Sequence, residues 1–152
     1  MSIPLSFLAA AWVIAISGAA APAADDARVQ DVTFTAQCDG TEQRYVLMLP
    51  ADFQPAQSHD VLIALHGHGS DRWQFVRDPR DECRAARDVA AKRGMLFVSP
   101  DYRARTSWLG QKAETDLVQI IAEVKLQQRV ARVFVCGGSM GATLRRSPNT
   151  AL

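Results

Sequence analysis

A serine flanked by glycines lies near the end of the printed sequence. Ser139 has a glycine two residues before it and another two residues after it, in the run Gly137-Gly138-Ser139-Met140-Gly141. This G-x-S-x-G spacing is typical of a sharp turn between a strand and a helix that exposes a nucleophilic serine. Glycine is needed because the turn brings backbone against backbone, where a Cβ would clash. The pattern predicts that Ser139 attacks and that the Met140 N–H stabilises the developing oxyanion.

A second glycine-rich run, His66-Gly67-His68-Gly69, follows an apolar segment earlier in the chain. Its H-G-x-G form is that of a loop that supplies a further oxyanion donor. We expect the His66 side chain to orient this loop, while the backbone N–H of Gly67 or His68 faces the carbonyl oxygen. The alternative is that both histidines are ordinary polar groups of a loop.

The same two glycine-rich runs also resemble parts of two other kinds of site. The H-x-H spacing resembles part of a metal site, but zinc needs three or four protein ligands and His59 is the only other histidine. A dinucleotide site fails because Ser139 stands where G-x-G-x-x-G needs glycine. The sequence therefore favours neither a metal site nor a dinucleotide site.

The elements that must position these residues follow from the apolar pattern. Three apolar runs, each too short for a helix, predict buried parallel strands at residues 61–65, 95–98 and 133–136. A helix is expected at residues 80–93, capped by Asp78-Pro79 and ended by Gly94. Another, of about four turns, is expected around an apolar stripe formed by Leu117, Ile120, Ile121 and Val124.

The chain is expected to open with an antiparallel pair of strands. Residues 33–36 and 44–49 are β-like runs, and the turn signal Asp39-Gly40 separates them. The predicted fold class is therefore α/β, with an antiparallel start followed by a parallel βαβαβ sheet. Ligands of such sheets bind outside the carboxyl ends of the strands, so the loops that begin at His66, Asp101 and Gly137 should meet.

Three aromatic residues lie on the loops that leave this edge. Trp73, Trp108 and Tyr102 could wall a pocket for an acyl or aromatic group. They could equally pack on the core as lids, and the sequence leaves both roles open.

The net charge of the chain and its N-terminal residues indicate which partners and which cellular location to expect. The chain has 17 Lys and Arg against 16 Asp and Glu, a net charge of +1, which gives no electrostatic case for binding nucleic acid. A charge-free apolar stretch ending in Ala21-Pro22-Ala23 predicts a signal peptide over residues 1–23. We expect a secreted or periplasmic protein with no stable membrane span after cleavage. An uncleaved N-terminal anchor is the alternative, because no Lys or Arg stands at the start.

Export would place the three cysteines in an oxidising compartment. Cys38 and Cys83 could pair there, which leaves Cys136 over. We expect Cys136, on a strand, to be a small buried apolar residue rather than a reactive thiol.

The chain resembles α/β-hydrolase esterases. The resemblance covers residues 44–141 and is closest to the secreted polyhydroxybutyrate-depolymerase and feruloyl-esterase-like group, followed by prolyl-oligopeptidase-type domains. It implies hydrolysis of a small-molecule or polymer ester, or secondarily of a peptide, through an acyl-serine and without a cofactor. The motifs that carry it are Leu65-His66-Gly67-His68-Gly69, Ser99-Pro100-Asp101-Tyr102 and Cys136-Gly137-Gly138-Ser139-Met140-Gly141.

The resemblance also implies an acid and then a histidine after the serine. Residues 140–152 contain no Asp, Glu or His, so we expect residues 24–152 to be the N-terminal part of such a domain, with absent or impaired activity. Residues 142–152 begin a helix that Ser147-Pro148-Asn149 breaks, which suggests a shifted reading frame or a truncated gene model. We then expect an exposed apolar strand edge and poor folding. The other class of function is a non-catalytic exported α/β module that binds a small ligand.

Overall fold

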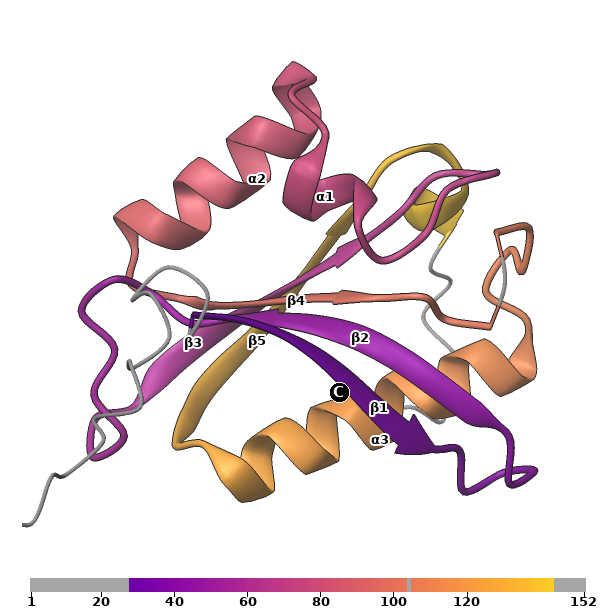
Figure 1. The fold of residues 1–152 in the computed structure, drawn as a ribbon, viewed down its shortest axis with the longest axis horizontal. Coiled ribbons are helices and arrows are strands. Elements are labelled where there is room, and N and C mark those ends of the chain that lie inside the picture. Colours follow the sequence, from indigo (N-terminus) through magenta and orange to yellow (C-terminus); the bar gives the residue numbers. More distant parts are fainter. Residues whose placement is uncertain (1–27, 104, 144–152) are drawn as a thin grey trace, which may run out of the picture.

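The computed structural model describes residues 28–103 and 105–143 (Figure 1). The predicted signal peptide and residues 144–152 of the predicted tail lie outside the described residues. In chain order the elements are β1 (Val29–Thr35), β2 (Glu42–Met48), β3 (His59–Leu65), α1 (Gln74–Arg77), α2 (Asp81–Lys92), β4 (Leu96–Pro100), α3 (Gln111–Gln127), β5 (Val130–Gly137) and the 3₁₀-helix η2 (Ser139–Thr143).

The five strands form one mixed sheet in the order β1-β2-β4-β3-β5. β1 pairs antiparallel with β2, and β2 pairs antiparallel with β4. β3 runs parallel to both β4 and β5, so that Val61 of β3 lies opposite Leu96 on one side and Val133 on the other. The predicted α/β class, with an antiparallel start and a parallel βαβαβ part, is confirmed.

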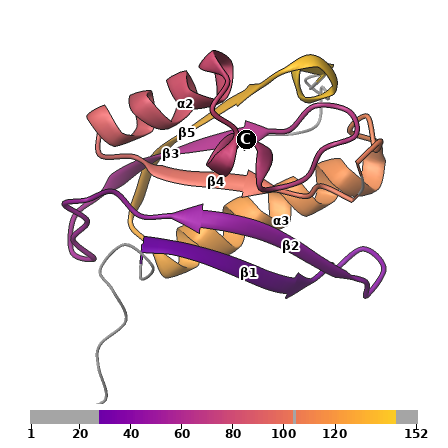
Figure 2. The ribbon, with the colours of Figure 1, turned by 45° about the horizontal axis from the view of Figure 1, so that its top comes forward.

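Helices cover both faces of this sheet. α1 and α2 lie on one face and α3 on the other (Figures 1 and 2). The crossover from β3 to β4 therefore passes over one face, and the crossover from β4 to β5 passes over the other. β3 lies where the strand order reverses, which is where ligands bind in open α/β sheets.

The run at residues 61–65 is buried on both faces, as its unbroken apolar sequence predicts. Successive side chains of a strand point to opposite faces. Val61, Ile63 and Leu65 accordingly pack in the cluster under α3, whereas Leu62 and Ala64 pack in the cluster under α1 and α2.

The predicted capping residue of the first long helix is wrong. Asp78 does not cap α2, because its Oδ1 accepts the Arg80 N–H at 2.9 Å in a turn before the helix, which begins at Asp81. The predicted end at Gly94 is confirmed. Gly94 has φ +58°, and the Met95 N–H donates to the Ala90 carbonyl at 2.9 Å, as in a Schellman motif.

The apolar stripe of the second long helix is confirmed. Leu117, Ile120, Ile121 and Val124 are all buried on α3, against the sheet face that includes Val61 and Ile63. No helix within the described ranges has both the length and the apolar character needed to cross a membrane.

The prediction that the third apolar run forms a buried strand is wrong for β5. Its residues are mostly half-buried or exposed, and Phe134 is 42% exposed. Among the described residues β5 pairs only with β3, so it is an edge strand, and an edge strand lacks a neighbour to cover it. The Arg132 guanidinium lies 5.4 Å from the centre of the Phe134 ring and partly shields it.

The cysteines do not form the pair that the sequence left open. All three are free. Cys38 lies beside α3, with its Sγ 3.8 Å from Asp116 Oδ1, whereas Cys83 is buried in the cluster on the opposite face of the sheet. Cys136 is half-buried and packs against that same cluster. Burial raises the pKa of the Cys83 and Cys136 thiols, which favours their uncharged form.

Candidate active site

Ser139 lies on the turn that joins β5 to η2, at the carboxyl edge of the sheet. Its φ is +52°, a left-handed conformation that few residues other than glycine adopt. Ser139 is exposed, while the following Met140 is fully buried and anchors the turn in the core. This exposed, strained serine between a strand and a helical turn is the geometry that G-x-S-x-G predicts.

The two outer glycines of the motif are required by close backbone contacts. A Cβ on Gly141 would lie 2.2 Å from the Leu65 carbonyl oxygen, and one on Gly137 would lie 2.6 Å from the Gly141 carbonyl oxygen. Leu65 is the last residue of β3 and immediately precedes His66. The turn therefore rests on the start of the second glycine-rich run, and the two predicted loops meet.

Hydrogen bonds hold the backbone of the His66 loop on both sides of Gly67. The His66 carbonyl accepts a hydrogen bond from the Tyr102 hydroxyl, and the Gly67 N–H donates to Gln74 Oε1 at 2.7 Å. The Gly67 carbonyl accepts from the Ser70 N–H at 3.2 Å and lies 2.8 Å from His66 Nδ1. Both peptides that flank Gly67 are thereby fixed in orientation.

In the part of the chain that the structure describes, one N–H of these two peptides has no hydrogen-bond partner. The carbonyl and N–H of a trans peptide point in opposite directions. Because the Gly67 carbonyl points toward Ser70 and the His66 ring, the His68 N–H points away from them, and it makes no hydrogen bond within the described residues. Of the two predicted donors, Gly67 is engaged and His68 is available.

The His66 imidazole is not arranged as a base for Ser139. It is fully buried, and its Nε2 lies 3.2 Å from the Asp101 carbonyl while Nδ1 faces the Gly67 carbonyl. The Tyr102 ring stacks against it, with 4.4 Å between ring centres. This placement matches a residue that orients the loop.

Arg72 ties this loop to the rest of the sheet, and no sequence motif pointed to it. Its guanidinium contacts both carboxylate oxygens of Asp31 on β1 at 2.8 Å and reaches Asp101 Oδ2 at 2.9 Å. Asp101 Oδ1 also accepts the Arg72 N–H at 2.8 Å. Arg72 and Asp101 line a polar cleft of about 400 Å³ together with His66.

The Arg72 contact makes this region sensitive to acid. Hydrogen bonding to Arg72 lowers the pKa of Asp31. A carboxyl whose pKa is lowered by folding stabilises the fold above its unfolded pKa of about 4, and this contribution is lost as the pH falls further. We expect the unfolding midpoint to drop between about pH 5 and about pH 3, and to drop less in Asp31→Asn. Thermal melts recorded across this pH range measure the midpoint of both the unmodified chain and the variant. Asp88→Asn, at an exposed carboxyl on α2, is the control, and equal acid sensitivity in both variants would contradict the prediction.

The three aromatic residues have different surroundings. Tyr102 is buried under the His66 loop and belongs to the core. Trp73 is half-buried, with the Arg77 guanidinium 3.7 Å from its ring centre. Trp108 is 54% exposed, and its ring centre is 5.8 Å from that of His68. Of the three, Trp108 is the exposed aromatic, and it lies beside the His68 side chain.

Comparison with solved structures decides the fold. A ferulic acid esterase from Anaeromyces mucronatus superposes with a TM-score of 0.58 at 19% identity, covering 75% of this chain and 49% of its own. The chain has the α/β-hydrolase fold. An S-formylglutathione hydrolase from Agrobacterium tumefaciens superposes with a TM-score of 0.60 at 14% identity, covering 73% of this chain and 48% of its own. An S-formylglutathione hydrolase from Staphylococcus aureus superposes with a TM-score of 0.56 at 15% identity, covering 74% of this chain and 48% of its own. No family model and no curated protein sequence matches.

The chain spans about half the length of these α/β-hydrolase structures. Within the residues that the structure describes, no imidazole or carboxylate is hydrogen-bonded to the Ser139 side chain. The same residues bring no three His, Cys, Asp or Glu side chains together as metal ligands. This part of the fold thus brings an exposed serine close to backbone N–H groups. Tyr102, which the sequence motifs include, and Gln74 and Arg72, which they do not, hold this arrangement in place.

Proposed function

We propose that this chain carries the nucleophile and the oxyanion donors of a serine hydrolase that cleaves carboxylic esters. The single observation that carries the proposal is the position of the His68 N–H, which has no partner among the described residues and lies on a loop packed against the Ser139 turn. A Cβ on Gly67 would lie 3.7 Å from the Gly138 carbonyl oxygen, so the two loops are in contact at this point. The solved structures with this fold include a ferulic acid esterase, which favours an ester as substrate.

The chemistry follows from these groups. Ser139 Oγ attacks the ester carbonyl carbon, and its proton passes to an imidazole base that is not among the described residues. The His68 and Met140 N–H groups stabilise the negative oxygen that forms, and one such donor typically contributes about 10²–10³ in rate. The alcohol leaves with the proton, an acyl-serine remains, and water then releases the carboxylic acid.

Covalent labelling tests the assignment of Ser139. A fluorophosphonate should modify Ser139 slowly, with loss of fluoride, and the rate should rise with added imidazole, which takes the place of the base. Peptide mass mapping should locate the label on Ser139, and Ser139→Ala should abolish it. Binding of an ester ligand without any labelling, even at high imidazole, would indicate the non-catalytic module instead. Equal labelling of Ser139→Ala would also contradict the proposal.

A further inference from the structure

We infer that Gln74 and Tyr102 are positioning residues that clamp the peptide between His66 and Gly67 from its two sides and thereby aim the His68 N–H. The inference rests on the proposed function of Ser139 and goes beyond it, because neither side chain belongs to the nucleophile or to the oxyanion donors. Tyr102 holds the carbonyl of this peptide and Gln74 holds its N–H.

Gln74 is rigidly mounted on α1. Its backbone N–H donates to the Asp71 carbonyl at 3.0 Å, and the next residue, Phe75, is buried in the core under α2. Arg87 of α2 then fixes α1 by donating to the Phe75 carbonyl at 2.7 Å and to the Asp78 carbonyl at 3.0 Å. The amide oxygen of Gln74 therefore reaches Gly67 from a short helix that is itself held at both ends.

Tyr102 is held equally firmly on the other side. Its side chain is buried in the cluster under α3, whereas Phe75 belongs to the cluster on the opposite face of the sheet. Burial raises the pKa of the Tyr102 hydroxyl well above its usual value, so the hydroxyl keeps its proton and remains a donor. The two hydrogen bonds thus come from the two layers that sandwich the sheet.

A clamp of this kind controls the direction of the next peptide. With the first peptide fixed, the Gly67 carbonyl is turned toward Ser70 and the His66 ring, and the His68 N–H must point outward. Without the clamp, only the contacts at the Gly67 carbonyl hold the next peptide, and Gly67 has no side chain to restrict its backbone rotation. The oxyanion donor is then present but no longer aimed.

The functional arm of the test measures the rate of fluorophosphonate labelling of Ser139. Tyr102→Phe removes only the hydroxyl, and Gln74→Met removes the acceptor at similar size. Each is expected to slow labelling roughly tenfold, and Gln74→Glu, which keeps an acceptor oxygen, should restore most of the rate. Tyr45→Phe is the matched control, because Tyr45 is also fully buried but its hydroxyl has no partner within the described residues. Unchanged labelling in both clamp variants would overturn the inference.

The structural arm measures hydrogen exchange at the Gly67 and His68 amides and does not depend on activity. The Gly67 amide should be protected in the unmodified chain and should exchange roughly tenfold faster in Gln74→Met and in Tyr102→Phe. The exposed Gln57→Met variant should leave this exchange unchanged. If Ser139 is never labelled, the proposed function fails, yet the exchange rates still decide the clamp. Unaltered Gly67 protection in both clamp variants would refute it.

Discussion

Replacing Gly141 by alanine is expected to abolish labelling of Ser139 and to destabilise the fold by about 3 kcal/mol. The added Cβ would lie 2.2 Å from the Leu65 carbonyl oxygen and 2.9 Å from the Leu65 Cβ. Neither contact can be relieved by a side-chain rotation, since one partner is backbone and the other is fixed to it. β3 and the Ser139 turn must then separate, which removes the contact between the two loops. Urea unfolding and mass mapping of the label measure the two effects.

Gly138→Ala provides the matched comparison within the same turn. A Cβ at Gly138 would meet nothing within 4 Å, so the free energy of unfolding should change by less than about 1 kcal/mol. A large loss in this variant, or none in Gly141→Ala, would show that the close approach of β3 and the turn does not limit stability.

Replacing Arg103 by methionine is expected to be the most damaging change away from the Ser139 turn, with a loss of about 3–5 kcal/mol. Arg103 Nη2 lies 2.8 Å from Asp116 Oδ1, and Nε lies 2.5 Å from Asp116 Oδ2. Asp116 on α3 is only 1% exposed, so without the guanidinium a buried carboxylate would be left unpaired. The variant should unfold at a markedly lower urea concentration.

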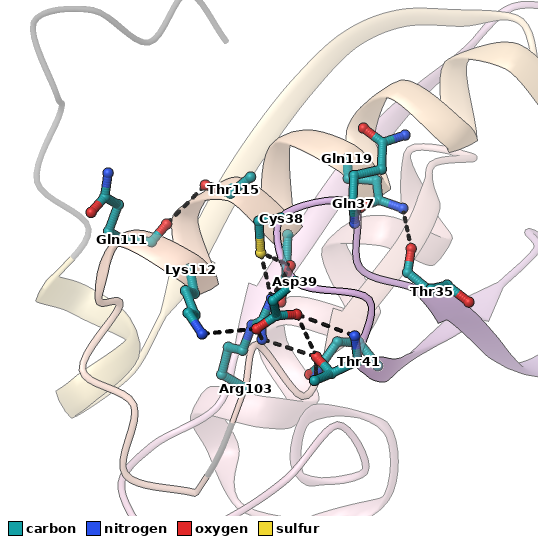
Figure 3. A network of polar contacts seen from close by, with 12 residues as sticks. Thr35, Gln37, Cys38, Asp39, Thr41, Arg103, Gln111, Lys112, Thr115 and Gln119 are labelled. Atoms are coloured by element: carbon teal, nitrogen blue, oxygen red, sulfur yellow. Dashed lines mark hydrogen bonds and ion pairs between the residues drawn. The ribbon is translucent and has the colours of Figure 1, made fainter.

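Arg103 also joins parts of the chain that are distant in sequence. Its Nη1 binds Asp39 Oδ2 at 2.7 Å in the turn between β1 and β2, and Lys112 Nζ binds the same oxygen at 2.9 Å (Figure 3). Hydrogen bonding to Arg103 and Lys112 holds the pKa of Asp39 below its usual range. Arg103 itself has φ +90°, a backbone conformation that these contacts offset. Because Tyr102 is its neighbour, loss of Arg103 should also loosen the hydroxyl contact to His66.

An exposed arginine separates this buried pairing from charge loss in general. Arg132 makes a two-point contact with Asp60 at 3.1 and 2.7 Å, but its side chain is 71% exposed. Arg132→Met should change the free energy of unfolding by less than about 1 kcal/mol, since solvent screens exposed pairs. Similar losses in the two variants would mean that burial of Asp116 is not the cause.

The local pattern of residues in the sequence was sufficient to predict much of the fold. The stripe of apolar residues on α3 needs only a helical period to be recognised, and residues 61–65 need only their unbroken apolar run. Likewise, Gly94 marks a helix end because few other residues adopt φ +58°. Each of these features depends on neighbours within a few residues, which a sequence displays directly.

Contacts between distant residues were not predictable in the same way. The spacing of Gln74 carries no signal, because its partner Gly67 is chosen by how α1 packs on α2. The same holds for Arg72, whose carboxylate partners Asp31 and Asp101 are 41 and 29 residues away. The possible pairing of Cys38 with Cys83 was excluded only when the sheet placed them on opposite faces.

The sequence by itself determined the turn at Ser139, because the strand, the glycine spacing and the serine are all local. It also determined the α/β class, since the lengths and periods of the apolar runs allow few other arrangements. Only the tertiary structure decided which N–H of the His66 loop has no hydrogen-bond partner among the described residues. That choice depends on Gln74 from one layer and Tyr102 from the other, and packing alone brings both to the same peptide.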